Sequence, residues 1–481
     1  MHIVILGNGI AGMEAALTVR QREPDWEITV ISEESHHCFS RTALMWVATG
    51  QLSHRCIEPF ERDIYERLQF KRIRARAIGI DVETREVWLA GALPRVGYDR
   101  LLIACGSRPR PAPWPGREKV GIGHFVSMQD LEWFEKELHG GPGPAGRPLF
   151  PDAHVTSSSV DSPYYPRPSA RAQRGSPPKN PVVVGGGLIG IEAVEVLASM
   201  KIESRFFIRE EWFWPIALDS REAAWITSRM CRHGVDVRLG EQIESFLGEE
   251  ELVTGVSTDR GIYPCDLCVV AIGVVPNTEW LRASSLMLDE RGGIKVDSGL
   301  AAHLSHDPER DLGIFAAGDC ASVRWYNGWQ RPEQLWYTSR DQGRLAGRRL
   351  LGDSANYERG LWYNSAKLMD IEYTTAGLVN MSVEDERSWF FEEQGSVHST
   401  SRIVLSGDRV VGFNFLGRRW DHQILLRWIE EKRSLDWVLK HLGEASFDTE
   451  FVPPLRLPEE LPRALPEDGD RSRSTNAVSG F

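Results

Sequence analysis

The sequence has little of three features that would mark other classes of protein. Its seven cysteines are scattered through 481 residues and odd in number, which excludes a disulfide framework and predicts reduced thiols. It lacks an apolar run of about 20 residues, the length that a membrane-spanning helix needs. It also lacks an excess of positive charge, because the formal net charge is −12. This balance argues against nucleic acid and against an anionic membrane as the main partner.

Targeting and linker signals are also sparse. No basic segment with a cleavage site precedes the first glycine motif, so we expect a cytoplasmic protein. Two segments hold few apolar residues and much proline, serine, glycine or charge, and we interpret both as disordered: residues 140–180 and 451–481. The remaining length suffices for about three domains.

The first patterned stretch has the order strand, glycine turn, helix. Residues 2–6 are an apolar run typical of a buried parallel strand, and residues 13–21 suit a helix. Glycines between such elements allow a tight turn and bring backbone N–H groups to a pyrophosphate at the helix N-terminus. An acid about 20 residues further on would hold the ribose hydroxyls. Ser32 and Glu33 both fall there, and Glu33 is assigned with four turn residues: Gly7, Gly9, Ala11 and Gly12.

A second motif of the same kind follows residue 180. The apolar run 181–184 leads into the turn Gly-Gly-Gly-Leu-Ile-Gly and a helix over 191–198. The next strand ends in Arg209-Glu210, a mixed signal, because a carboxylate favours NADH and an arginine favours the 2′-phosphate of NADPH. Arg209 is equally well explained as a solvated charge at a strand end. The residues assigned to this second dinucleotide site are Gly185, Gly187, Gly190 and Arg209.

Two dinucleotide sites in one chain call for two dinucleotides, and FAD with NAD(P)H is the usual chemical pairing. Four further strings then resemble one family. They are Leu-Leu-Ile-Ala-Cys-Gly-Ser-Arg-Pro at 101–109, Val-Val-Ala-Ile-Gly-Val-Val-Pro-Asn-Thr at 269–278, Gly-Ile-Phe-Ala-Ala-Gly-Asp-Cys-Ala at 313–321 and Phe-Ser-Arg-Thr-Ala-Leu at 39–44. Residues 1 to 350, without the insertion, resemble the pyridine nucleotide–disulfide oxidoreductases, in the branch with rubredoxin and ferredoxin reductases, NADH oxidases and the N-terminal part of nitrite reductase.

The resemblance implies an α/β fold with two Rossmann-like domains of the glutathione-reductase type and a C-terminal α+β domain. The implied FAD-binding domain is 1–115 with 295–352, the NAD(P)-binding domain is 116–139 with 181–294, and the α+β domain is 353–450. In the family such a third domain packs over the flavin or makes a dimer contact. Its pattern here predicts strands over 402–405 and 413–415 and helices within 420–442.

The resemblance also implies roles for single residues. Asp319 matches an aspartate that binds the FAD ribityl chain, and Arg41 matches an arginine near the FAD phosphates. Glu192 matches a glutamate that orients hydride transfer at the nicotinamide. Trp336 matches a tryptophan beside the flavin ring, although a simple buried aromatic explains it equally well. Further backbone positions implied at the cofactors are Ala104, Gly106, Gly273 and Gly318.

The cysteine pattern indicates whether a thiol can take part in electron transfer. A redox-active Cys-x4-Cys pair is absent, and Thr42 stands where NADH oxidases of the family keep a single cysteine. A hydroxyl cannot replace a reactive thiolate, and we expect Cys38 to be an ordinary buried thiol. The pair Cys265 and Cys268 has no second pair or histidines to complete a metal site, so no metal is predicted.

We therefore expect an FAD-dependent NAD(P)H oxidoreductase in which the flavin itself passes electrons to a small redox protein or a small molecule. A flavin-bound redox sensor or scaffold with little turnover is one alternative. An NADH oxidase is another, and Thr42 weakens it. Nucleic acid and membrane are not among the expected partners, and a homodimer is an option that the third domain leaves open.

Overall fold

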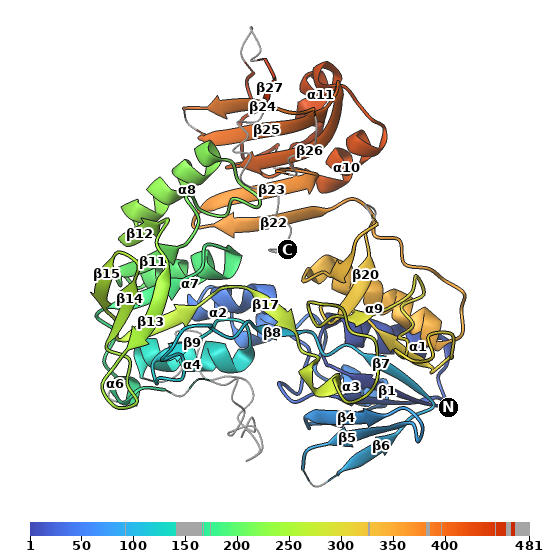
Figure 1. The fold of residues 1–481 in the computed structure, drawn as a ribbon. Coiled ribbons are helices and arrows are strands. Elements are labelled where there is room, and N and C mark those ends of the chain that lie inside the picture. Colours follow the sequence, from blue (N-terminus) through green and yellow to red (C-terminus); the bar gives the residue numbers. More distant parts are fainter. Residues whose placement is uncertain are drawn as a thin grey trace. The chain divides into compact units, whose positions relative to one another are not determined.

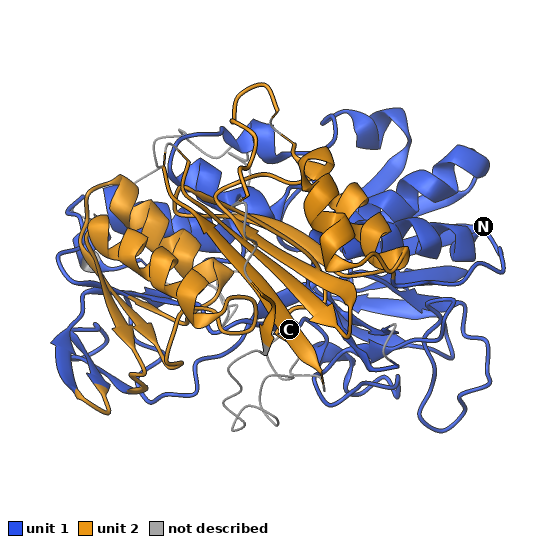
Figure 2. Cartoon of the chain, turned by 90° about the horizontal axis from the view of Figure 1, so that it is seen from above, with its two compact units in different colours: residues 1–182, 244–257, 261–359 blue, residues 183–243, 258–260, 360–481 orange. Residues whose placement is uncertain are grey.

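The computed structural model describes residues 1–91, 93–140, 166, 168–173, 175–325, 328–380, 385–395, 397–447, 449–457 and 463–466. The chain forms two compact units, coloured separately in Figure 2. Unit 1 contains residues 1–182, 244–257 and 261–359, and unit 2 contains residues 183–243, 258–260 and 360–481. The C-terminal residues therefore belong to the same unit as the second glycine motif.

Unit 1 is built on a parallel sheet of the order β19-β7-β1-β2-β3, of which β1 and β7 are labelled in Figure 1. Four of its strands are short, mainly apolar runs whose side chains are mostly buried, as expected for strands covered on both faces, whereas the edge strand over residues 70–73 is Phe-Lys-Arg-Ile and is largely accessible. Helices α1 (Ile10–Arg22) and α9 (Trp336–Leu350) pack together, and a side-chain carbon at Gly343 would lie 2.4 Å from the Ala11 carbonyl oxygen. The strands are β1 (His2–Leu6), β2 (Glu27–Ile31), β3 (Phe70–Ile73), β7 (Arg100–Ile103) and β19 (Ile314–Ala316).

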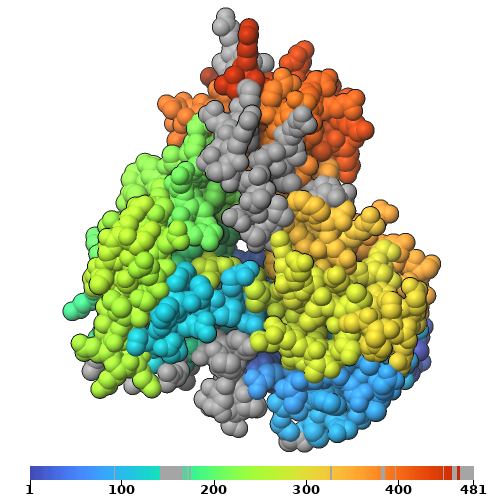
Figure 3. Space-filling view, in the orientation of Figure 1, coloured from blue at the N-terminus to red at the C-terminus, as the bar shows by residue number. Residues whose placement is uncertain are grey.

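An antiparallel sheet of β4 (Ala77–Asp81), β5 (Glu86–Leu89) and β6 (Arg95–Gly97) flanks this core. Figure 3 shows its blue surface beside the yellow surface of residues near 300, and Arg310 Nη1 donates to Glu83 Oε1 at 2.7 Å there. Unit 1 also contains the short helical segments η1 (Arg41–Ala43), α2 (Leu44–Ala48), η2 (His54–Ile57), α3 (Ile64–Arg67), α4 (Met128–His139) and η3 (Glu279–Leu281).

Most of the remaining strands of unit 1 form small sheets. β8 (Ser107–Pro109) pairs antiparallel with β17 (Val274–Pro276). β9 (Ile122–Gly123) pairs parallel with β16 (Leu267–Val270), and these two strands lie at one end of a five-stranded sheet. The others are β13 (Ile243–Leu247), β14 (Gly255–Thr258) and β15 (Gly261–Pro264) in one sheet, and β18 (Ile294–Lys295), β20 (Ala321–Arg324) and β21 (Gln330–Pro332) in another.

Unit 2 begins within β10 (Pro181–Val184) and continues through α7 (Leu188–Ser199). β11 (Ser204–Ile208) and β12 (Val235–Leu239) are parallel neighbours joined by α8 (Ser220–Arg232). Asp219 and Glu222 form a capping box that starts α8, because each side chain accepts a backbone N–H of the other residue.

The C-terminal part of unit 2 is an α+β domain, as predicted. Six strands lie in the order β22-β23-β26-β25-β24-β27, and α10 (His422–Glu430), α11 (Leu435–His441) and η4 (Leu442–Ala445) pack on a core that includes Trp389, Phe413 and Trp428. The predicted hairpin is confirmed, since Ser406 pairs with Arg409. The strands are β22 (Tyr363–Leu368), β23 (Ile371–Gly377), β24 (Glu386–Glu393), β25 (Ser399–Ser406), β26 (Arg409–Leu416) and β27 (Leu465–Pro466).

Polar contacts hold this sheet against α8. Glu222 is fully buried and forms an ion pair with the equally buried Arg402 of β25 at 3.0 Å. Asn414 Nδ2, from β26, donates to Glu222 Oε1 at 3.0 Å. A buried carboxylate is costly unless it is paired and hydrogen-bonded, and here both conditions are met. The carboxylate that starts α8 thus also joins the helix to the sheet.

The disorder predicted over 140–180 and 451–481 is wrong in part. Residues 170–173 form helix α6 (Ala170–Gln173), and Arg171 Nη2 donates to Glu137 Oε2 at 2.6 Å. In the tail, Leu465 pairs with Ser388 at the edge of the C-terminal sheet. Long-range partners order these pieces despite their composition. Residues 141–165 and 467–481 lie outside the described residues. None of the helices in the described ranges is long and apolar enough to cross a bilayer.

Candidate dinucleotide and redox sites

The first glycine turn joins β1 to α1 in unit 1. Gly7 has φ +120°, and a side-chain carbon there would lie 2.0 Å from the Ala104 carbonyl oxygen. A side-chain carbon at Gly12 would lie 2.1 Å from the Gly7 carbonyl oxygen, whereas one at Gly9 would meet no atom within 4 Å. Helix α1 begins at Gly9 with no side-chain cap among the described residues. Its first N–H groups are thus available to an anion, which fits a dinucleotide phosphate.

The second turn repeats this geometry in unit 2. Gly185 has φ +114°, and a side-chain carbon at Gly190 would lie 2.1 Å from the Gly185 carbonyl oxygen. One at Gly187 would meet nothing within 4 Å, and no side chain in the described part of unit 2 caps α7 at this residue. Both turns therefore have a closed side for packing and an open side for a phosphate.

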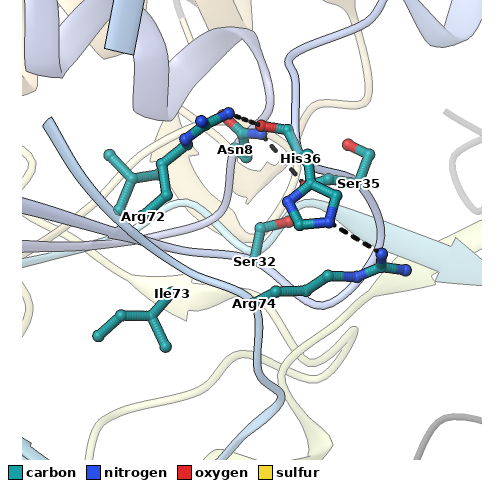
Figure 4. A pocket seen from close by; sticks show the side chains of 8 residues that line it. Asn8, Ser32, Ser35, His36, Arg72, Ile73 and Arg74 are labelled. Atoms are coloured by element: carbon teal, nitrogen blue, oxygen red, sulfur yellow. Dashed lines mark hydrogen bonds between the residues drawn. The ribbon is translucent and has the colours of Figure 1, made fainter. Parts of the chain in front are cut away.

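A pocket lies beside the first turn, at the end of β2 (Figure 4). Asn8, Ser32 and His36 line it together with Arg72 and Arg74. Arg72 Nη1 donates to the His36 carbonyl oxygen and Arg74 Nη1 to His36 Nε2, both at 3.2 Å. The two guanidinium groups give the walls a positive charge, which suits an anionic group, while the Asn8 amide is already hydrogen-bonded: its Nδ2 donates to the Ser35 carbonyl oxygen at 3.4 Å and its Oδ1 accepts from the Tyr65 hydroxyl at 2.6 Å.

The acid assigned to the ribose lies beside this pocket. Ser32, directly after β2, lines the pocket, and Glu33 is not among the lining residues. Glu33 Oε1 is buried and has no hydrogen-bond partner among the described residues. Burial raises the pKa of this carboxyl. An unpartnered carboxylate oxygen at this place fits a ligand hydroxyl, so the assignment of Glu33 stays a prediction and Ser32 remains the alternative candidate.

Asp319 follows β19 and is held by two hydroxyl groups. Ser107 Oγ donates to Asp319 Oδ2 at 2.7 Å, and Ser339 Oγ donates to Oδ1 at 3.0 Å. The backbone N–H of Gly318 donates to Gln342 Oε1 at 2.8 Å. Burial raises the pKa of Asp319, and both hydroxyl groups oppose this effect. Sequence reasoning missed both serines, which come from β8 and α9.

Arg41 has a carboxylate partner that the motif did not predict. Its Nη1 donates to Glu34 Oε1 at 2.9 Å and to the Val126 carbonyl oxygen at 3.2 Å, and its Nη2 also contacts Glu34. Glu34 Oε1 further accepts the backbone N–H of Met128 at 3.0 Å. Arg41 is therefore fixed in a fork on Glu34, near Asp319, whose charge acts on it.

The other implied positions in unit 1 lie at strand ends. The Ala104 N–H donates to the Leu6 carbonyl oxygen at 2.8 Å, next to the first turn. Asn277 N donates to Gly106 O at 2.9 Å and Arg110 N to Gly273 O at 3.0 Å, beside the β8–β17 pair. Trp336 is the first residue of α9, and the Arg340 guanidinium lies 5.5 Å from its ring centroid.

The implied nicotinamide site lies on α7. Burial, with a smaller effect from the neighbouring Glu195, raises the pKa of Glu192 to about 8. The nearby Arg209 has 72% of its side chain exposed and donates to Glu210 Oε1 at 2.8 Å. This geometry matches a solvated charge at a strand end. The role of Arg209 toward a 2′-phosphate stays a prediction.

The cysteines near the first turn lack the features of a reactive thiolate. Cys38 is buried, and burial raises the pKa of its thiol to about 12. Thr42 shares a hydrogen bond with Ser40 at 3.0 Å. Cys265 and Cys268 are buried, and within the described residues no group of three metal-binding side chains comes together. The expected burial of Cys38 is confirmed.

Comparisons with known proteins agree with this geometry. Residues 1–343 match the family model described as pyridine nucleotide-disulphide oxidoreductase. The nitrite reductase (NAD(P)H) of Bacillus subtilis is 23% identical over 442 residues, which are 91% of this chain and 48% of that protein. The ferredoxin–NAD(+) reductase component of the p-cumate 2,3-dioxygenase system of Pseudomonas putida is 23% identical over 444 residues, 90% of this chain and 94% of that protein.

A solved structure shows the same fold. A ferredoxin reductase from Rhodopseudomonas palustris gives a TM-score of 0.72 at 22% identity and covers 92% of this chain and 99% of its own. The chain thus spans about half the length of the nitrite reductase but nearly all of the ferredoxin reductases. The family match covers both glycine turns and the Asp319 segment. The chain belongs to the pyridine nucleotide-disulphide oxidoreductase family.

Proposed function

We propose that the chain takes hydride from NAD(P)H bound at the second glycine turn, transfers it to FAD bound at the first, and delivers the electrons to a small electron-transfer protein of the ferredoxin type. The observation that carries this proposal is the pair of helices, α1 and α7, that begin at glycines without a side-chain cap in the described residues. Each helix end offers N–H donors and positive potential to one pyrophosphate.

The residues around each turn would position the cofactors. FAD, when bound, supplies an acceptor for two electrons that can release them one at a time. Asp319, fixed by Ser107 and Ser339, would orient the ribityl chain, and Arg41 would offset phosphate charge. Glu192 would hold a proton at its carboxyl beside the nicotinamide at neutral pH, because its pKa is about 8.

Two observations favour an iron–sulfur protein as the acceptor. The buried Cys38 thiol and the Thr42 hydroxyl do not supply a thiolate next to the first turn, which disfavours thiol-based peroxide or disulfide reduction by this segment. The Pseudomonas putida relative, whose name gives ferredoxin as its partner, aligns with 90% of this chain. Direct transfer to an iron–sulfur protein therefore suits the chain better than a thiol substrate.

Anaerobic mixing tests this function. The purified protein should lose its yellow flavin absorbance within seconds of mixing with NADH or NADPH, and the faster nucleotide identifies the donor. Adding a [2Fe–2S] ferredoxin with cytochrome c as the reporter should then give steady turnover. Colourless protein that takes up no added FAD would overturn the proposal, and reoxidation by oxygen alone would make the chain an NADH oxidase.

We also propose a cytoplasmic location and a homodimer. The seven cysteines are all free, which suits a reducing compartment. Light scattering on the eluting protein would give the mass directly, and the chain mass of 54.3 kDa would contradict the dimer.

A further inference from the structure

A lysine of the C-terminal sheet reaches the helix of the second turn. Lys367, on β22, lies 2.5 Å from Glu195 Oε1 of α7, with 24% of the lysine side chain and 11% of the glutamate side chain exposed. The other oxygen, Glu195 Oε2, is buried and has no hydrogen bond among the described residues. The ammonium of Lys367 is therefore the main counter-charge of a largely buried carboxylate, although these residues are 172 positions apart.

Glu195 follows Glu192 by three positions on α7, and residues at this spacing share one face of a helix. The charge of Glu195 acts on Glu192 and favours its protonated form. Burial raises the pKa of Glu195, and the hydrogen bond and charge of Lys367 oppose this effect. Lys367 thus favours the charged form of Glu195 and, through that charge, the protonated form of Glu192.

The other charged groups around Glu195 leave Lys367 as its counter-ion. Asp370, beside β22, acts on Glu195 as a like charge. Asp370 is itself bound by Arg229 of α8, whose Nε donates to Oδ1 at 2.6 Å, and it lies near His233. Across the sheet from Lys367, Glu372 accepts from Arg419 Nη2 at 2.7 Å. These acids already have cationic partners.

We propose that Lys367 is a positioning residue for hydride transfer: its ammonium favours the carboxylate form of Glu195, and this charge favours the protonated form of Glu192. The proposal rests on the proposed function for the role of Glu192 at the nicotinamide. It assigns to the C-terminal domain a part in controlling the nucleotide site of its own unit.

Two variants test this relay from Lys367 through Glu195 to Glu192. The quantity measured is the midpoint pH at which Glu192 loses its proton, and the direction of its shift is the test. Glu195→Gln removes the like charge, so Glu192 should lose its proton at a pH lower by about one unit. Lys367→Met should shift the same midpoint in the same direction, because Glu195 then takes up a proton and loses its charge. The double variant should match Glu195→Gln alone. If Lys367 acted on Glu192 directly, Lys367→Met would raise the midpoint, and this result would overturn the relay.

The midpoint is measured in two ways. The first is the pH dependence of anaerobic flavin reduction by NAD(P)H. The second is a pH titration of the infrared band of the protonated carboxyl group in the holoprotein without nucleotide, where Glu192→Gln identifies the band. If the enzyme does not reduce its flavin but the infrared midpoints shift as predicted, the proposed function fails while the relay stands.

Two controls separate the relay from folding. Lys367→Arg keeps the cation and should restore the wild-type midpoint, and Lys440→Met, which removes an exposed lysine of α11, should leave it unchanged. A midpoint that stays at its wild-type value in folded Lys367→Met and Glu195→Gln proteins would overturn the proposal.

Discussion

The two glycine turns have nearly the same backbone but different side-chain surroundings. In both, a glycine with a strongly positive φ starts the turn. A side-chain carbon added to the last glycine would lie 2.1 Å from the carbonyl oxygen of the first. Around the first turn lie serine hydroxyls, guanidinium groups and the hydrogen-bonded Asp319. On the helix of the second turn lie Glu192 and Glu195.

This difference separates what the backbone does from what the side chains do. A helix N-terminus suits a pyrophosphate in either place, so the turns alone do not distinguish FAD from NAD(P)H. Groups that suit a polyhydroxyl chain lie at the first turn, whereas the second has a carboxyl that titrates near neutral pH. The side chains therefore select the chemistry, and the following predictions test that division.

The largest effect is expected from closing the first turn. Gly12→Ala forces a carbon against the Gly7 carbonyl and should lower the free energy of unfolding by at least about 3 kcal/mol. Gly9→Ala meets no protein atom within 4 Å, so the fold should lose only about 1 kcal/mol while the affinity for FAD falls at least about tenfold. Thermal melting measures the stability of each variant, and the flavin content of the purified protein reports its affinity for FAD. Equal loss of stability in both variants would contradict the assignment of an open side.

A substitution in the second turn should weaken nucleotide binding without changing flavin binding at the first turn. Gly187→Ala, the counterpart of Gly9→Ala, should leave flavin content unchanged and weaken NAD(P)H binding about tenfold. Gly443→Ala is the matched control, because its added carbon also meets nothing within 4 Å and it lies in η4. Nucleotide titration followed by flavin bleaching measures the affinity. Loss of flavin from the Gly187 variant would show that the turns are not separate sites.

The acidic pair of the second turn predicts a pH dependence. Flavin reduction should change around pH 8, where Glu192 loses its proton, and Glu192→Gln should remove this change. The pKa of Glu192 is higher in the folded than in the unfolded protein, so its contribution to stability is complete below the unfolded pKa and is lost as the pH rises through about 8. Denaturant melts at several pH values should show that Glu192→Gln lacks this decline.

The smallest effect is expected at Cys38. With a pKa of about 12, its thiol is almost entirely protonated at neutral pH, so Cys38→Ala should change the rate of flavin-dependent turnover by less than about twofold. Cys56→Ala, at an exposed cysteine, is the control. A loss of turnover confined to the Cys38 variant would return the chain to the thiol-dependent branch of the family.

Sequence reasoning succeeded where the signal is local. The glycine spacings predict both turns because a few neighbouring residues suffice to shape the backbone, and the hairpin of β25 and β26 follows from alternation around one turn. It missed what distant segments supply. Ser107 is 212 positions from Asp319, and Arg171 binds Glu137 from a stretch whose composition predicts disorder. No local pattern records such partners.

The side chain that meets the ribose shows the same limit. A count from Gly12 reaches both Ser32 and Glu33, which follow β2, and only the three-dimensional structure shows that Ser32 lines the pocket while Glu33 does not. The Glu34 partner of Arg41 also depends on how the segment after β2 folds back. A motif can therefore predict a functional residue without predicting the side chain to which that residue is hydrogen-bonded.

The most direct test of two separate dinucleotide sites is to count the nucleotides bound to one chain. FAD released from the denatured protein is measured by absorbance, and NAD(P)⁺ binding to the oxidised holoprotein is measured by calorimetry. We predict one FAD and one nicotinamide nucleotide for each chain, with Gly9→Ala reducing the first count and Gly187→Ala only the second. A single dinucleotide for each chain, lost in both variants, would contradict the account.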